Sequence, residues 1–183
     1  MSEKLDRLQL KLLVLRCQIG DNVAFEELVT RFSPGLRYFL SKMLSRTAVD
    51  DAMQDVWLSV WRGLARLLDA DAFATWTYRI ARDRAYQELR TDSRIVHMPL
   101  SQVPMEIVEQ EITFSTDDVQ RINEELGLLP AAQREALTLH FIEGMKYEEV
   151  AAVVGCPVGT VRSRIYYGKQ SLKQSIAKAH TNE

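Results

Sequence analysis

The residues best suited to chemistry lie between residues 157 and 178, where five Lys or Arg residues occur without a single Asp or Glu. If this segment is helical, Arg162, Lys169 and Lys173 line one flank, while Gly159 and Ser163 point outward near its start. Basic flanks bind phosphates, and small polar groups near a helix N-terminus can reach base edges in the major groove. The segment therefore favours a DNA-recognition helix over the alternative, an ordinary helical hairpin with a solvated basic face.

The elements that must position this helix form a sharp turn within residues 147–166. A short helix is predicted from Tyr147 to Val154, and Gly155 ends it because glycine adopts the left-handed conformation without a Cβ penalty. Pro157 stops continuation and presets φ for the next helix, which is expected to run from about Val158 into the 170s. The inward stripe of that helix has helical spacing: Val161, Ile165, Gly168, Leu172 and Ile176. This pattern is typical of a helix-turn-helix.

A second candidate surface lies on a helix predicted from about residue 72 to residue 90. Its outer face mixes aromatic and charged residues: Trp76, Arg79, Arg82, Asp83, Tyr86 and Arg90. Aromatic rings stack on unpaired bases, and arginines bind the phosphate backbone between them. The alternative is structural, with Phe73 and Trp76 capping the core while the arginines are solvated.

The strongest apolar periodicity occurs at about residues 48–68, where nine apolar residues follow helical spacing from Val49 to Leu67. The outer face of this predicted helix opens with Asp50, Asp51, Gln54 and Asp55. Acids in a first turn stabilise the helix dipole, which is one interpretation. The other interpretation is an acidic docking surface for a basic partner, and the residue pattern leaves both open.

The remaining segments complete an all-α organisation. A helix over residues 3–19 is expected to bury a stripe in the core: Leu5, Leu8, Leu12, Leu15 and Ile19. The next helix begins after Asp21 and is expected to break or kink at Pro34, with a further apolar segment over residues 36–44. The pattern fades after Thr91, and residues 98–126 carry seven acids and one base. We therefore expect two small helical domains, residues 1–94 and 117–183, joined by an acidic linker over 95–116.

Composition narrows the class of protein. The 183 residues carry a net charge of −2, so a DNA-binding role rests on the distribution of charge and not on its total. His97, His140 and His180 are scattered, and Cys17 and Cys156 lack metal-ligand spacing, so no metal, cofactor or catalytic constellation is predicted. No apolar run is long enough for a membrane span and the first residues are too charged for a signal peptide, so we expect a cytoplasmic protein.

Three stretches in order give the chain a family resemblance that covers nearly its whole length. They are residues 50–62 (DDAMQDVWLSVWR), residues 73–90 (FATWTYRIARDRAYQELR) and residues 128–172, which include the helix-turn-helix. The chain resembles a bacterial RNA polymerase sigma factor of the extracytoplasmic-function (ECF) class. Three positions depart from the family pattern. Asp83 stands where Asn is common, and Tyr166 and Tyr167 stand where basic residues are common.

The resemblance implies roles for three sets of residues. Docking on the clamp of core polymerase falls to Asp50, Asp51, Gln54, Asp55 and Leu58. Contact with the melted −10 strand falls to Phe73, Trp76, Arg79, Arg82, Asp83 and Tyr86. Contact with the −35 duplex falls to Gly159, Thr160, Arg162, Ser163, Arg164, Tyr166, Tyr167 and Lys169.

The implied function is a transcription initiation factor without catalytic chemistry, which directs core RNA polymerase to promoters by melting and reading the −10 element and reading the −35 element. Core polymerase, promoter DNA and an anti-sigma factor are the implied partners, with no membrane insertion. The alternative is a stand-alone helix-turn-helix regulator that binds duplex DNA. It explains residues 147–166 but leaves the predicted helices at 48–68 and 72–90 without a role.

Overall fold

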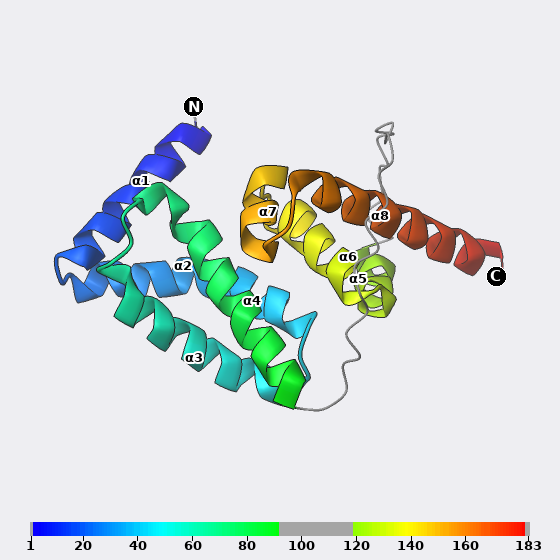
Figure 1. Cartoon of the computed structure of the whole chain (residues 1–183), viewed down its shortest axis with the longest axis horizontal. Coiled ribbons are helices and arrows are strands. Elements are labelled where there is room, and N and C mark those ends of the chain that lie inside the picture. The colour runs from blue at the N-terminus through cyan, green and yellow to red at the C-terminus, as the bar shows by residue number, and fades with distance from the viewer. Residues whose placement is uncertain (1, 92–118, 182–183) are drawn as a thin grey trace. The chain divides into compact units, whose positions relative to one another are not determined.

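The computed structural model describes residues 2–91 and 119–181, which form helices and no strand (Figure 1). The chain divides into two compact units, residues 1–95 and 96–183. The predicted acidic linker over 95–116 lies outside the described residues. Each unit is described below by itself.

Unit 1 contains four α-helices and one short turn of 3₁₀ helix. They are α1 (Ser2–Gln18), α2 (Asn22–Ser41), α3 (Arg46–Leu64), η1 (Ala70–Ala72) and α4 (Phe73–Thr91). α4 lies along α3, and α2 contacts both of them (Figure 1). Each helix buries one apolar face, and these faces meet in a core that includes Phe39, Val56, Phe73 and Ala81. Phe73 packs edge-to-face on Phe32 and Phe39 on Tyr78, at centroid separations of 5.1 and 5.7 Å.

The turn between α1 and α2 is closed by Gly20 and Asp21. Gly20 adopts φ +92°, where a residue with a Cβ is strained. The Asp21 carboxylate caps α2 by accepting from the backbone N–H of Ala24 at 3.1 Å and also pairs with Arg16 at 2.6 Å. These interactions, the Ala24 N–H first, hold the pKa of Asp21 below its ordinary value. The cap's stabilising effect is therefore complete above that ordinary pKa and is lost as pH falls through the lowered one.

Of the break or kink expected at Pro34, the break is wrong, because α2 runs without interruption from Asn22 to Ser41. A proline inside a helix removes a hydrogen bond and crowds the preceding turn, at a cost of about 3 kcal/mol or more. Pro34 is exposed, whereas Leu28 before it and Leu36 and Phe39 after it are completely buried. Packing of both halves against the same core offsets the local cost.

The apolar stripe predicted for the core in residues 3–19 is also placed wrongly. Leu5, Leu8, Leu12, Leu15 and Ile19 are all exposed. α1 carries a second apolar set, Leu13, Val14 and Cys17, and the fold buries that one. Polar anchors fix the rotation of α1, since the Gln18 side-chain amide donates to the carbonyls of Leu64 and Leu67 at 3.0 and 2.7 Å.

Unit 2 is built around its last helix. Its elements are α5 (Val119–Leu128), α6 (Ala131–Leu137), a π-helical turn η3 (Thr138–Ile142), α7 (Tyr147–Val154) and α8 (Val158–Thr181). α8 packs against α5, α6 and α7. Val161, Ile165, Gly168 and Leu172 face this core, as the spacing predicts.

The predicted helix-turn-helix is confirmed. α7 has the predicted bounds, and Gly155 ends it in the left-handed conformation at φ +69° and ψ +38°. The N–H of Gly155 donates to the Ala151 carbonyl at 2.9 Å, and α8 begins one residue after Pro157. At the other end of α7, the Glu149 carboxylate accepts from the Lys146 N–H at 2.7 Å. Local hydrogen bonds therefore fix both ends of α7, and Gly155 and Pro157 define the sharp turn into α8.

Gly168 sets how closely α8 approaches α6. A Cβ at this position would lie 2.7 Å from Cδ1 of Leu137, which is itself buried. We expect Gly168→Val to lower the free energy of unfolding by about 1–3 kcal/mol, the usual cost of overpacking. Urea denaturation followed by circular dichroism measures this change. The same substitution at Gly127, where a Cβ meets nothing within 4 Å, is the matched control and should change stability by less than about 0.5 kcal/mol. Equal effects at the two sites would contradict the close approach.

Candidate functional site

The exposed face of α3 gathers the residues predicted to dock on a partner. Val49, Ala52, Met53, Val56, Val60 and Leu64 are buried on the opposite side of the helix. Asp50, Asp51, Gln54, Asp55 and Leu58 consequently lie together on the outward side, within an arc of about 140° at 100° per residue. Leu58 is 49% exposed, which gives the acidic face an apolar centre. We call these five residues the α3 face.

Two acids of the α3 face are already paired within unit 1. Asp50 accepts a hydrogen bond from Arg37 of α2, and Asp55 pairs with Nε of Arg84 of α4 at 2.8 Å. Arg84 also reaches Glu88 at 3.2 Å, so it connects α3 with the second half of α4. Asp51 and Gln54 make no hydrogen bond or ion pair with the rest of the described chain, so their polar groups face solvent. They are the members of the α3 face best placed to receive a basic partner.

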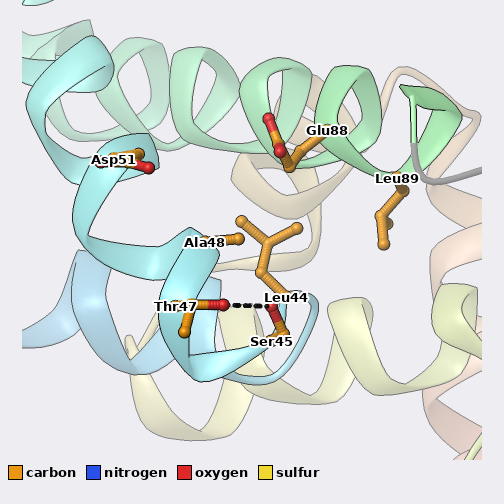
Figure 2. Close-up of a pocket in the computed structure, with 7 residues that line it drawn as sticks. All are labelled: Leu44, Ser45, Thr47, Ala48, Asp51, Glu88 and Leu89. Carbon is orange, nitrogen blue, oxygen red and sulfur yellow. Dashed lines mark hydrogen bonds between the residues drawn. The ribbon is translucent and has the colours of Figure 1, made fainter.

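A shallow hollow of about 250 Å³ lies beside Asp51 (Figure 2). Its apolar walls are Leu44 from the loop between α2 and α3, Ala48 from the start of α3, and Leu89 from α4. Asp51 and Glu88 supply carboxylates from the two helices. Such a hollow fits the aliphatic stem and charged head of a lysine or arginine.

The outward face of α4 brings together the predicted aromatic and charged residues. Arg79 and Asp83 are exposed, and Trp76, Arg82 and Tyr86 are half-buried at the edges of this face. The Arg82 guanidinium lies over the Tyr86 ring, 4.5 Å from its centroid, and 3.9 Å from the Asp83 carboxylate. The surface therefore offers both aromatic rings and guanidinium groups, with one acid among them.

Phe73 has a different position from the other five predicted residues of α4. It is completely buried, and its ring packs against Phe32 and lies 6.2 Å from that of Trp76. A buried ring cannot stack on a base, so Phe73 supports Trp76 and does not itself belong to the surface. The Trp76 indole also lies close to the backbone of Gly63 in α3, because a Cβ on Gly63 would lie 2.8 Å from Cζ2 of the indole. Sequence spacing alone does not reveal this contact between helices.

The outward face of α8 carries the third set of residues. Gly159 and Arg162 are exposed, and the other six members are half-buried: Thr160, Ser163, Arg164, Tyr166, Tyr167 and Lys169. The Ser163 hydroxyl donates to the Gly159 carbonyl at 3.1 Å, and the rings of Tyr166 and Tyr167 meet edge-to-face at 5.4 Å. At 100° per residue the eight positions span an arc of about 220°, with Arg162 and Lys169 on one flank and Arg164 on the other.

An aromatic cluster outside the predicted set supports the basic flank of α8. Tyr147 stacks with His140 at 4.6 Å, and Arg162 lies over the Tyr147 ring at 5.8 Å. Lys169 lies over the Phe141 ring at 5.4 Å. The Nδ1–H of His140 donates to the Met145 carbonyl at 2.7 Å, which fixes the orientation of the cluster. These contacts join α8 to η3 and α7, so periodicity along one helix could not identify them.

Two features of the described residues concern metal binding and membrane insertion. Among the residues that the structure describes, no group of three or more His, Cys, Asp or Glu side chains is placed to hold a metal ion. Within the same residues, no helix has the length and apolarity needed to cross a bilayer. The surfaces available are three helical faces that differ in charge and aromatic content.

Two family descriptions match the chain, one in each unit. Residues 28–95, which include α3 and α4, match sigma-70 region 2, and residues 120–172, which include the helix-turn-helix, match sigma-70 region 4. These matches define the class of protein as a sigma-70-type transcription factor.

Comparison with related sequences defines the family within this class. The ECF RNA polymerase sigma-E factor of Escherichia coli K12 is 32% identical over an alignment of 190 positions, covering 96% of this chain and 97% of that protein. The sigma-E factor of Haemophilus influenzae is 31% identical over 178 positions, covering 90% and 93%. The chain therefore belongs to the ECF sigma factors, which direct RNA polymerase to promoters. A stand-alone helix-turn-helix regulator is not favoured, because it would not explain the region 2 match.

Solved structures agree with this fold. CnrH, in complex with the cytosolic domain of CnrY, is 26% identical with a TM-score of 0.68, and the match covers 93% of this chain and 98% of CnrH. RpoE of Bartonella quintana, in complex with the anti-sigma factor NepR, is 24% identical with a TM-score of 0.66, covering 84% and 96%.

Proposed function

We propose that the three faces divide the work of promoter recognition. The α3 face docks on the clamp of core polymerase. The outward face of α4 captures unstacked bases of the −10 element, and the outward face of α8 enters the major groove of the −35 element. The protein acts in the cytoplasm without catalytic chemistry of its own. The observation that supports this proposal is that α3 and α4 pack through their buried faces, so that each leaves its own polar face exposed.

Docking on polymerase is assigned to the α3 face because its free groups are acidic or amide groups beside a hydrophobic contact. Asp51 and Gln54 face solvent, Leu58 is half-exposed, and the hollow beside Asp51 fits a basic side chain. Interfaces with a desolvated apolar centre and complementary charge combine affinity with orientation. The Asp55–Arg84 ion pair links this face to α4.

Capture of the −10 strand is assigned to α4 because its outward face combines a supported indole with guanidinium groups. Stacking of a base on an aromatic ring is worth about 1–3 kcal/mol, which offsets part of the cost of unstacking the duplex. The Trp76 ring lies beside Phe73 and close to Gly63, and these contacts support it. Arg79 and Arg82 supply charge for the phosphates on the same face.

Binding of the −35 duplex is assigned to α8 through its N-terminal half. Arg162 and Lys169 lie on the flank nearest α7 and are positioned by Tyr147 and Phe141, so they suit phosphate contacts. Gly159, Thr160 and Ser163 are small and lie at the start of the helix, where they permit close approach to base edges. The tyrosines add contact area but no charge.

The net charge of −2 fits a factor that borrows affinity from polymerase. Phosphate contacts dominate the affinity of a protein for DNA, and this chain offers few of them. Docking on core polymerase converts both DNA contacts into local events at a high effective concentration. CnrH was solved with the cytosolic domain of a partner protein, and we extend this to an anti-sigma factor that covers one of the faces here.

The α3 face can be tested by reversing charge at its free residues. Asp51→Arg combined with Gln54→Ala should abolish binding to core polymerase, because the added cation repels a basic partner and both side chains are solvent-facing. Pull-down with core polymerase measures binding, and circular dichroism confirms that the helical content is retained. Glu27→Arg combined with Gln9→Ala, on exposed positions of α2 and α1, is the control with equal charge change. Unchanged affinity in the α3 variant would remove the docking assignment.

The acid on the α4 face should limit capture of the −10 strand. We expect Asp83→Asn to raise the affinity of holoenzyme for a single-stranded −10 oligonucleotide several-fold, because a carboxylate beside the strand repels phosphate. The asparagine amide also offers different hydrogen bonds to a flipped base, so the base preference should change at one position of the −10 element. Binding to an oligonucleotide panel with each base varied in turn measures both effects. Glu27→Gln is the control, and identical affinity and base preference would exclude Asp83 from the interface.

Arg162 should contact a phosphate and carry no sequence information. Arg162→Ala should weaken binding of holoenzyme to −35 duplexes by a similar factor for all sequences and lower the salt slope of log K by about 1. Titrations at several salt concentrations, with consensus and substituted duplexes, measure this. The control is Arg46→Ala in α3, also an exposed base, which should leave the slope unchanged. A loss confined to one base pair would show instead that Arg162 reads a base edge.

A further inference from the structure

A row of aromatic rings beside α8 places a histidine between two of its bases. Arg162 lies over the Tyr147 ring at 5.8 Å from its centroid. Lys169 lies over the Phe141 ring at 5.4 Å. The His140 ring contacts both of these rings, with its centroid 4.6 Å from each of theirs. His140 therefore lies at the basic flank of α8, although it belongs to η3 and not to α8.

One nitrogen of the His140 ring is used within the protein and the other is open. The Nδ1–H donates to the Met145 carbonyl at 2.7 Å, which fixes how the half-buried ring is turned. Nε2 makes no hydrogen bond with any described residue and is not a buried atom, so solvent or a ligand reaches it. The ring is thus oriented by one nitrogen and offers the other.

The protonation state of the imidazole decides what Nε2 offers. A neutral ring carries one N–H, and the Met145 carbonyl takes it here, so Nε2 presents a lone pair that repels phosphate oxygens. A protonated ring donates from both nitrogens and adds a positive charge, which strengthens the hydrogen bond to an anion. Histidine is the side chain whose charge changes between about pH 5 and 8. Nε2 therefore becomes a charged donor for phosphate as pH falls through this range.

The place of His140 in the helix-turn-helix favours a DNA phosphate as the ligand. When the second helix of such a motif enters the major groove, the first helix crosses the phosphate backbone. His140 stacks on Tyr147, the first residue of α7, and that ring also contacts Arg162 of α8. The start of α7 and the adjoining flank of α8 are the parts of the motif that meet the backbone.

The charges around His140 leave the charge of a protonated ring free for an external anion. On the elements packed against η3, the charged residues near this site are Arg134 and Glu135 of α6, Glu143 after η3, Lys146, Glu148 and Glu149 at the start of α7, and Arg162 and Lys169 of α8. Glu135 is buried, and the Glu149 carboxylate accepts from the Lys146 N–H at 2.7 Å. In the described part of the chain, none of these carboxylates pairs with His140.

We propose that His140 is a further residue of the −35 surface, which contacts a DNA phosphate through Nε2 when the imidazole is protonated. Binding of DNA then takes up a proton, so the affinity is greatest at low pH and falls as pH rises. A phosphate carries no sequence information, so the effect is the same for every −35 sequence. This inference rests on the proposed assignment of α8 to the −35 duplex.

The test measures binding of holoenzyme to −35 duplexes between about pH 8 and about pH 6. The affinity of the unchanged chain should rise about fivefold towards the lower pH, and the salt slope of log K should become steeper by about 1. His140→Gln stays polar but cannot gain the charge, so it should match the unchanged chain at the upper pH and lose most of the rise. His140→Arg should bind tightly at both pH values. His180→Gln removes a histidine near the end of α8 and is the matched control, which should keep the full rise.

The pH profile separates a phosphate contact from other roles of the ring. A rise that persists in His140→Gln, or that is absent from the unchanged chain, would overturn the proposal. An equal loss of affinity by His140→Gln at both pH values would also contradict it, because that pattern identifies a purely structural role. A rise confined to one −35 sequence would show instead that the imidazole reads a base edge. Failure of the −35 assignment itself is recognised separately, because Arg162→Ala would then leave binding unchanged at both pH values.

Discussion

The packing of α3 against α4 is the interaction on which the rest of unit 1 depends. Both helices bury small residues on their inner sides, among them Ala52, Ala81 and Ala85, which allows a close approach. Gly63 continues this close contact up to the Trp76 indole, and the Arg84–Asp55 ion pair fastens the helices on their outer side. Because the apolar faces are used in this contact, the outward faces are left to polar and aromatic residues. Two separate exposed faces follow from one packing arrangement.

In unit 2, close packing of short helices likewise leaves one face of a helix exposed. Gly168 brings α8 close to α6, and Gly155 turns the chain sharply between α7 and α8. The recognition helix is then buried along Val161, Ile165 and Leu172 and free along its basic flank. His140 and Phe141 lie in the π-helical turn that follows α6. Their rings, with that of Tyr147, support the basic flank of α8. The direction of the outward side chains of α8 is thus determined by packing beneath and beside them.

The sequence predicted best what depends on local chemistry. A left-handed glycine, a proline and a clean apolar stripe specify the helix-turn-helix, and its bounds are confirmed. The sequence predicted poorly which of two apolar stripes on one helix would be buried. α1 has two apolar stripes, and spacing cannot say that the core takes Leu13 and Val14 while Leu8 and Leu12 stay exposed. Polar anchors from distant residues decide this, as Gln18 does by binding the Leu64 and Leu67 carbonyls.

Pro34 and Phe73 illustrate the same limit from two directions. Local propensity ends a helix at proline, yet burial of Leu28 and Phe39 on either side carries α2 through it. An aromatic residue at the start of a helix proposed to bind DNA suggests a base contact, yet Phe73 is completely buried, whereas Trp76 is only half-buried. In both cases the free energy of burying large apolar side chains exceeds a local preference. The residues available for surface contacts are therefore those that the core does not bury, and only the three-dimensional packing identifies them.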